Sequence, residues 1–476
     1  MQIAFDNSYA RLPERFYTKQ SPVPVKAPEL LAFNAALAAQ LGITVPDPDA
    51  LAEIGAGNRL PDGAEPLAQV YAGHQFGGFS PQLGDGRAML LGEVVSDSGR
   101  FDIQLKGSGR TPYSRQGDGR AWLGPVLREY VVSEAMAALG VRTSRALAAV
   151  RTGEFVFREQ GALPGAVLTR VAASHIRVGT FQFFAARRDI EALQALYEYV
   201  VARHYPQARD PAALLEAVIA AQADLVSHWM AVGFIHGVMN TDNTTLSGET
   251  IDYGPCAFMD RYHPDMVYSS IDAQGRYSYA NQPRILVWNM AQLATALVPL
   301  MPDQDEAVTE FTRIVHAMPE QIEQRWRQRF GEKIGLASAT ADDDTLIGDL
   351  LSLMASGRAD FTNTFRALTD ALHGSDVAPR DQFLDPAQFD AWHERWQARL
   401  VQEDAPQMRM ARVNPVFIPR NHRIEQMIAA AVSDDFSVFE RLLDVLGDPY
   451  SPREDAQDLT RPPTESEIVR QTFCGT

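Results

Sequence analysis

The sequence predicts an α+β fold with two lobes, in which a small mixed lobe is followed by a large and mostly helical lobe. Two strand-like runs, 88–95 and 101–106, lie in the first half of the chain. From about residue 190 onward, apolar residues recur mainly at helical spacing. Because strands and helices are segregated along the chain, two lobes are the simplest architecture.

Residues 1–65 are expected to form an N-terminal extension. The segment 28–42, PELLAFNAALAAQLG, has the apolar spacing of a helix that ends at Gly42. Proline, aspartate and glycine then dominate as far as Gly63, which is typical of a loop.

The small lobe is expected over residues 66–185. In the run 101–106, apolar and polar side chains alternate, so Lys106 points away from the apolar face of its strand. The segment 127–139 has an apolar stripe at helical spacing, and Gly140 ends it.

The remaining residues, 186–476, are expected to form the helical lobe. Helical patterns cover 190–204, 211–233 and 285–301, and further segments follow down to Leu446. No internal repeat and no long low-complexity segment interrupts this lobe.

Composition and charge exclude several classes of protein. The 476 residues are 46% hydrophobic and 22% charged, as in an ordinary globular protein. A net charge of -17 argues against a nucleic-acid partner, because phosphate backbones are held by clustered Lys and Arg. No apolar run is long enough to span a membrane. The start, MQIAFDNSYARLPERF, lacks the apolar core of a secretory signal, so a cytoplasmic protein is expected.

The stretch 236–255, HGVMNTDNTTLSGETIDYGP, resembles the catalytic centre of a protein kinase with one part missing. A kinase catalytic loop reads H-R-D-L-x-x-x-N, and a later D-F-G supplies a metal-binding Asp. On this spacing Asn243 takes the place of the Asn, but Val238 takes the place of the Asp. Valine cannot accept a proton, so the ordinary kinase mechanism is disabled at that position.

Other polar residues of this stretch could form a metal site. Asp252 falls in the place of the D-F-G aspartate, and Asp242 precedes Asn243. Residues 244–246 and 250–252 can pair as a small hairpin, which would bring Asn243 near Asp252. Oxygen ligands of this kind suit a hard divalent cation, with Asp242 alongside as a replacement base. Asp, Asn and Gly are also common in plain turns, so other parts of a nucleotide site must decide.

Those other parts occur in the expected order along the chain. Lys106 ends a strand, and the following helix offers Glu129 or Glu134 as its partner, between which helical phase does not choose. Two GDGR segments, 84–87 and 117–120, can bring backbone N–H groups close to phosphates.

Additional cations accompany these segments. Arg170 and Arg177 flank the segment VAASHI, and each alone could be an ordinary surface residue. Together with Arg87 and Lys106, they would direct more positive charge at one cleft than a kinase normally directs at its nucleotide.

Several long words identify the chain as similar to the selenoprotein O family of pseudokinases. They are YAGHQFGGFSPQLGDGRA, QLKGSGRTPYSRQGDGRA, REYVVSEAMAALG, HGVMNTDN, IDYGP, PVFIPRNHRIEQMI and a C-terminal FCGT. The resemblance implies a protein-kinase-like fold and a protein adenylyltransferase, which moves AMP from ATP to Ser, Thr or Tyr hydroxyls of proteins. It also implies that ATP binds in an orientation flipped relative to kinases, with the γ-phosphate buried among cations.

The resemblance assigns roles to individual residues. It implies that Asp242 accepts the proton, that Asn243 and Asp252 hold Mg²⁺ or Mn²⁺, and that Glu129 holds Lys106. The residues implied to contact the nucleotide are Gly84, Gly86, Arg87, Lys106, Asp118, Gly119, Arg170, Arg177 and Asp252.

The chain has two cysteines, Cys256 and Cys474, which excludes a disulfide framework or a four-cysteine zinc site and fits a reducing compartment. In the family a C-terminal selenocysteine or cysteine is linked to redox control, and Cys474 occupies that place. In relatives the disulfide partner lies nearer the place of Tyr268. Two free thiols and a Cys256–Cys474 disulfide both remain open.

Three functions are consistent with these observations. The favoured one is AMP transfer to proteins, including self-modification, with UMP transfer from UTP and Mn²⁺ as a close variant. The others are an atypical kinase that uses Asp242 as its base and an inert nucleotide-binding regulator. Val238 weighs against an ordinary kinase, and the retained Asp242, Asn243 and Asp252 weigh against an inert protein.

Overall fold

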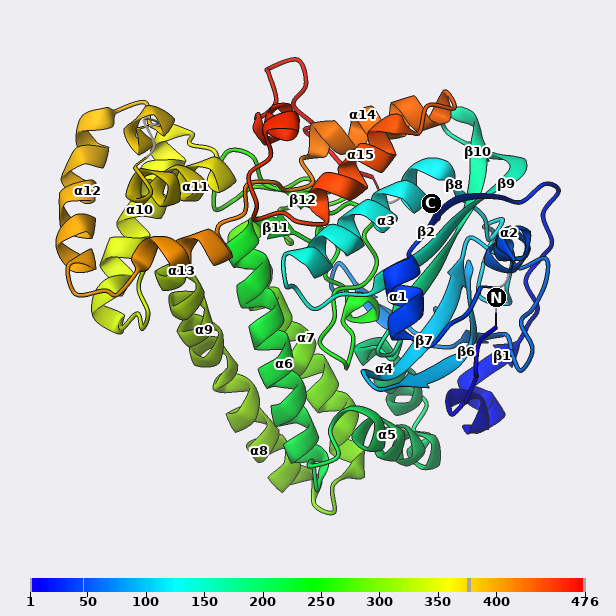
Figure 1. Ribbon diagram of the computed structural model, residues 1–476. Coiled ribbons are helices and arrows are strands. Elements are labelled where there is room, and N and C mark those ends of the chain that lie inside the picture. Colours follow the sequence, from blue (N-terminus) through cyan, green and yellow to red (C-terminus); the bar gives the residue numbers. More distant parts are fainter. Residues whose placement is uncertain (1, 46, 375–377, 474–476) are drawn as a thin grey trace.

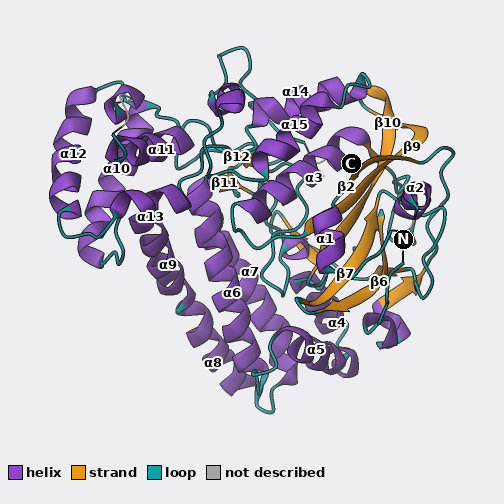
Figure 2. Cartoon of the chain, in the orientation of Figure 1, coloured by secondary structure: helices purple, strands orange, loops and turns teal. Residues whose placement is uncertain are grey.

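The N-terminal part of the chain forms an antiparallel sheet and the C-terminal part is helical, which confirms the predicted mixture (Figure 2). The structure is a computed structural model that describes residues 2–45, 47–374 and 378–473. None of the helices within these ranges combines the length and the apolar character needed to cross a membrane.

The large sheet has strands that come from the first 172 residues. Its order is β1 (Tyr17–Lys19), β3 (Leu67–Gln69), β6 (Ala88–Ser96), β7 (Gly99–Lys106), β10 (Gly161–Ala172), β9 (Arg145–Arg158) and β2 (Glu29–Phe33), and β8 (Ala121–Trp122) also pairs with β10. The predicted strands 88–95 and 101–106 correspond to β6 and β7. In the centre of the sheet, Lys106 on β7 pairs with Leu168 on β10, and Arg170 pairs with Gln104.

The predicted helix 28–42 is wrong in its first part. Residues Glu29–Phe33 form strand β2, which pairs with β9, and only Ala35–Gln40 form a helix, α1. The side chain of Asn34 accepts a hydrogen bond from the Leu37 amide and so begins this helix. Pairing with a strand more than a hundred residues away outweighs the local helical spacing. Helix α2 (Pro48–Ala56) follows.

Helix α3 (Leu123–Ala138) contacts β9 and β10 with a buried stripe that includes Leu127 and Val131. It begins four residues before the predicted start. The helix also carries Glu129, which is buried.

The helical part includes α4 (Val178–Ala186), α5 (Ile190–His204), α6 (Pro211–Val232), α7 (Gln282–Leu297), α8 (Gln304–His316), α9 (Met318–Lys333), α10 (Asp344–Gly357), α11 (Phe361–Leu372), α12 (Pro386–Leu400), α13 (Pro406–Val413), α14 (Asn421–Val432) and α15 (Ser437–Leu446). The predictions 190–204 and 211–233 agree with α5 and α6. Asp210 caps the start of α6, and Gly233 ends it in a left-handed conformation.

The last two helices return to the N-terminal part of the molecule. Figure 1 shows α14 and α15 lying along α3, and both contact it. The rings of Tyr130 on α3 and Phe439 on α15 lie 5.8 Å apart. One continuous buried core therefore includes residues from the sheet, from α3 and from the helical part.

Candidate active site

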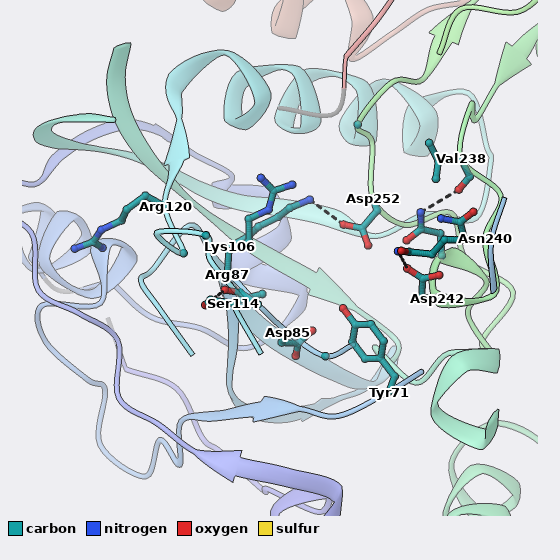
Figure 3. A pocket seen from close by; sticks show the side chains of 18 of the residues that line it. Tyr71, Asp85, Arg87, Lys106, Ser114, Arg120, Val238, Asn240, Asp242 and Asp252 are labelled. Carbon is teal, nitrogen blue, oxygen red and sulfur yellow. Dashed lines mark hydrogen bonds and ion pairs between the residues drawn. The ribbon is translucent and has the colours of Figure 1, made fainter. Parts of the chain in front are cut away.

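A cavity of about 780 Å³ lies where the sheet meets the loops that follow α6 (Figure 3). Its walls include residues of both parts of the chain. The predicted site residues that line it are Gly84, Gly86, Arg87, Lys106, Asp118, Gly119, Arg170, Arg177, Asp242, Asn243 and Asp252. The structure thus brings together residues that are spread over 169 positions of sequence.

Lys106 extends from the end of β7 to two carboxylates. Its Nζ donates to Glu129 Oε2 at 2.6 Å and to Asp252 Oδ1 at 2.8 Å. The partner on α3 is therefore Glu129, whereas Glu134 binds Arg145 at the other side of the helix through bonds of 2.7 and 2.9 Å. Figure 3 shows Lys106 reaching toward Asp252.

Two buried arginines join this cluster. Arg170 Nε donates to Glu129 Oε1 at 2.8 Å, and its Nη2 lies 2.7 Å from Asp252 Oδ1. Arg177 Nη1 donates to the Asp242 carbonyl at 2.7 Å and lies 3.2 Å from Asp252 Oδ2. Three cations consequently surround one carboxylate.

The cluster fixes the charge of Asp252. Burial alone would raise the pKa of this carboxyl group, but Arg170, Lys106 and Arg177 together hold it well below its ordinary value. Its backbone has φ of +63°, in the left-handed region that non-glycine residues rarely occupy. A charged side chain held in such a conformation is characteristic of functional sites.

Asp242 lies close to Asp252, because Arg177 Nη1 bonds both residues, but its carboxylate is in a different environment. It is buried, and Gln75 Nε2 donates to its Oδ2 at 3.1 Å, while Oδ1 has no hydrogen-bond partner among the described residues. Burial raises the pKa of this carboxyl group to about 6, against the lowering effect of the Gln75 bond. A side chain at Gly73 would collide with Oδ1, so glycine is required there. Oδ1 is itself shielded from solvent beside Gly73, but Asp242 as a residue lines the cavity, where its carboxylate can take up a proton from a bound group.

Asn243 lies beside Asp242 in a short 3₁₀ turn, Thr241–Asn243. Its Nδ2 donates to the Val238 carbonyl at 3.0 Å. This bond assigns the amide nitrogen and leaves Oδ1 as the acceptor or ligand.

The hairpin predicted for 244–246 and 250–252 does not form. Thr245 pairs instead with Arg177, and Thr250 pairs with Thr143. The Thr245 hydroxyl closes the intervening turn by bonding the backbone of Glu249 at 2.7 and 3.0 Å. Both segments are therefore held by the N-terminal part of the chain rather than by each other, yet Asn243 and Asp252 still line the same cavity.

The two GDGR segments lie on the sheet side of the cavity. Gly119 has φ of +70°, and a Cβ atom there would lie 2.2 Å from the backbone of Gly109, so the loop admits only glycine. The carboxylate of Asp118 is bound by Arg158 at 2.8 and 3.1 Å. Arg158 also lines the cavity, and the sequence offered no signal for it.

The oxygen atoms of Asn243 and Asp252 fit a hard divalent cation whose other ligands come from phosphates and water. No group of three or more His, Cys, Asp or Glu side chains arranged to hold a metal occurs among the described residues. The donor set therefore fits a metal that arrives with a nucleotide better than a closed structural site.

Comparison with known proteins decides the family. The family model described as "Protein adenylyltransferase SelO" matches residues 1–447. The chain belongs to the SelO family. It is 64% identical over 477 residues to the protein nucleotidyltransferase YdiU of Ruegeria sp. (strain TM1040), covering 100% of both chains. The corresponding protein of Bradyrhizobium diazoefficiens is 56% identical over 490 residues, with 99% of each chain covered. The predicted family and its class of activity, nucleotidyl transfer to protein, are confirmed.

Within this SelO-family site, sequence reasoning missed several residues. Tyr71 stacks under Arg177, with the guanidinium carbon 4.5 Å from the ring centroid, and Asp85 lies 3.8 Å from the same arginine. Asn240 accepts a hydrogen bond from Tyr277 at 2.6 Å. Tyr71 and Asp85 lie inside the words that carry the resemblance, but only the fold shows their contacts.

The predicted cysteine pair is only half described. Cys256 is buried, whereas Cys474 lies outside the described residues, so a disulfide between them stays a prediction. The last described residues pass beside the loop that follows Asp252, because the Thr472 hydroxyl donates to the Pro255 carbonyl at 2.5 Å.

Proposed function

We propose that this SelO-family protein transfers AMP from ATP to Ser, Thr or Tyr hydroxyls of proteins and releases pyrophosphate. The observation that carries this proposal is the meeting of Lys106, Arg170 and Arg177 at Asp252, beside a buried Asp242 in the same cavity. So many buried cations suit a triphosphate whose negative end lies deep in the cavity.

We further propose that residues 66–185 and 186–476 form the two lobes of a protein-kinase-like fold with the nucleotide reversed. In this orientation the α-phosphorus, rather than the γ-phosphorus, faces the acceptor. Three observations support this proposal. Lys106 pairs with Glu129, valine stands at position 238 where a kinase has its catalytic Asp, and Asp252 lines the cavity. The glycine-rich segments 84–87 and 117–120 would approach the phosphates with backbone N–H groups.

The chemistry follows from the positions of these groups. An acceptor hydroxyl gives its proton to the Asp242 carboxylate while its oxygen forms a bond to the α-phosphorus, and the bond from that phosphorus to the bridging oxygen of the departing pyrophosphate breaks. Lys106, Arg170 and Arg177 stabilise the charge on the departing pyrophosphate. Mg²⁺ or Mn²⁺ held by Asn243 and Asp252 would neutralise phosphate charge when bound.

Labelled nucleotides test the proposal. Label from the α position of ATP should appear on protein, including this chain itself, and label from the γ position should not. Transfer of γ label would show a kinase, and binding without either transfer would show an inert regulator. Parallel reactions with α-labelled UTP and Mn²⁺ determine whether UMP is the transferred group.

A further inference from the structure

A second cavity, of about 180 Å³, lies between α6, α9, α13 and the end of α3. None of its lining residues lines the candidate active site. About half of its wall is polar, and the polar and charged side chains are His228, Arg329, Glu332, Lys333, Arg412 and Tyr450.

Lys333, the last residue of α9, is the unusual member of this wall. Its side chain is buried, with 2% of the residue exposed. Among the described residues it has no hydrogen bond and no ion pair, and its Nζ contacts only the ring faces of Phe361 and Phe365, at 5.4 and 4.3 Å from their centroids. Cation–π contacts contribute about 2 kcal/mol each at best, less than the several kcal/mol that burying an ammonium group costs.

The other deeply buried cations of the chain are treated differently. Arg170 binds Glu129 and Asp252, Arg203 binds Glu93 and Asp102, and Arg420 binds Asp260 and Asp360. A fold that pairs its buried charges so completely elsewhere leaves Lys333 lacking an anion.

Neighbouring groups make the cavity cationic. Arg329 donates from Nε to Ser227 and from Nη2 to Asp224, which leaves its Nη1 without a partner among the described residues. The one carboxylate in the wall, Glu332, accepts a hydrogen bond from Gln328 at 2.7 Å.

We propose that this cavity is a binding site for one small oxyanion, a phosphate, sulfate or carboxylate group, held by Lys333 and Arg329. Its size supports a single such group. The cavity has less than a quarter of the volume of the candidate active site and lies below the range of typical organic-ligand pockets, so a second nucleotide would not fit. The site does not depend on the proposed transfer reaction.

The ionisation of the wall predicts how binding changes with pH. Burial lowers the pKa of Lys333 to about 7, and burial together with Arg329 lowers the pKa of His228 to about 3, so His228 is neutral at physiological pH. Burial raises the pKa of Tyr450 to about 12, so it also stays neutral. The other charged groups around the cavity are Arg329, Arg412, Glu332 and the nearby Asp224. Anion binding should therefore be strong at pH 6 and weak at pH 8.5, because Lys333 loses its charge as the pH rises through about 7.

Sulfate is the suitable probe, because it stays dianionic over this pH range. The test measures the melting temperature of the full chain in sodium sulfate and in sodium chloride of equal ionic strength. A Lys106→Met background removes one cation of the candidate active site and so weakens sulfate binding there. At pH 6 we expect a saturable rise of about 2–4 °C with sulfate, which disappears at pH 8.5. Sulfate also stabilises folded proteins in general, and this effect raises the melting temperature without saturation. That unsaturated rise serves as the baseline.

Lys333→Met in the same background should abolish the saturable rise. Without sulfate it should be at least as stable as its parent, because it removes an unpaired buried charge. Equilibrium dialysis with labelled sulfate gives a second readout that needs no variant at Lys333, and we expect one ion bound per chain at pH 6. Titrations with inorganic phosphate and with acetate then show which oxyanion binds best. Absence of bound sulfate, or a saturable rise that survives Lys333→Met, would overturn the proposal.

Discussion

Asp242 and Asp252 are two carboxyl groups in one cavity. Their surroundings shift the two pKa values in opposite directions. Three cations keep Asp252 ionised, whereas burial with a single amide donor raises the pKa of Asp242 to about 6. Such divergence separates a group that binds cations from a group that can take up a proton. Single substitutions at these residues should therefore have different effects.

We expect Asp242→Asn to slow AMP transfer by roughly 10²–10⁴-fold while ATP affinity changes little, because the amide keeps the shape but cannot accept the proton. Asp252→Ala should abolish transfer and also weaken metal-dependent nucleotide binding, because it removes one of the two proposed metal ligands. Transfer of α-label and calorimetric titration with ATP measure the two effects. Equal loss of ATP affinity in both variants would contradict these roles.

Glu249 offers a prediction about pH and stability. Burial raises the pKa of this carboxyl group to about 7, although its Oε2 accepts bonds from Ser247 and Ala173. A raised pKa means that ionisation of Glu249 destabilises the folded state. This cost begins as the pH rises above 4.5, the pKa in the unfolded chain, and reaches its full size above about pH 7, the pKa in the folded protein.

Glu249→Gln should accordingly stabilise the protein relative to wild type at pH 8.5 but not at pH 4.5. We expect a gain of about 1 kcal/mol, because Glu249 remains partly exposed and solvent screens its charge. Urea unfolding at the two pH values measures the difference. An equal effect at both pH values would show that the hydrogen bonds, rather than the charge, matter.

At the scale of elements, α3 connects the sheet with the site. Glu129 faces Lys106 and Arg170, whereas Glu134 faces Arg145 and the Ala146 amide. Helix α3 therefore carries two glutamates that form ion pairs, and only Glu129 binds residues of the cavity.

This arrangement gives a matched pair of variants. Glu129→Gln should destabilise the protein by roughly 3 kcal/mol, because it leaves two buried cations with less negative charge, and transfer should be lost. Glu134→Gln should cost about 1 kcal/mol and leave transfer unchanged, because its ion pair is more exposed. Denaturant unfolding and α-label transfer measure both effects. Loss of transfer in Glu134→Gln would mean that the position of the whole helix, rather than the Lys106 contact, controls activity.

At the scale of the whole molecule, the largest buried core includes residues of both parts, and a second buried cluster lies among α9–α13. Helices α14 and α15 come from the end of the chain and pack on α3, and the Tyr450 hydroxyl donates to the Leu139 carbonyl at 3.1 Å. The C-terminal helices therefore help to hold the helix that carries Glu129.

Because the buried core is continuous, we expect the sheet and the helical part to unfold in one transition. Phe439→Ala, which removes a buried ring against Tyr130, should cost about 3–5 kcal/mol of stability. It should therefore lower the temperature of that transition without splitting it. Near-UV and far-UV circular dichroism during heating should change together. Two separate transitions would show that the lobes are independent.

The sequence alone determined the local features of this protein. Helices α5 and α6 were predictable because their apolar periodicity and end signals are local. Strands β6 and β7 were predictable for the same reason. The residues that line the cavity were also indicated by the sequence, since most lie in long words that resemble one family.

Only the tertiary structure decided the features that depend on distant partners. Residues 29–33 form a strand because β9 lies beside them, and residues 244–252 form no hairpin because Arg177 and Thr143 pair with them instead. Glu129 rather than Glu134 binds Lys106 because of how α3 sits on the sheet. In the sequence Lys333 is an ordinary helical lysine, and it becomes a buried unpaired charge only where α9 meets α11 and α6. Periodicity encodes which face of an element is apolar, whereas the partner of that face is set by packing across the whole chain.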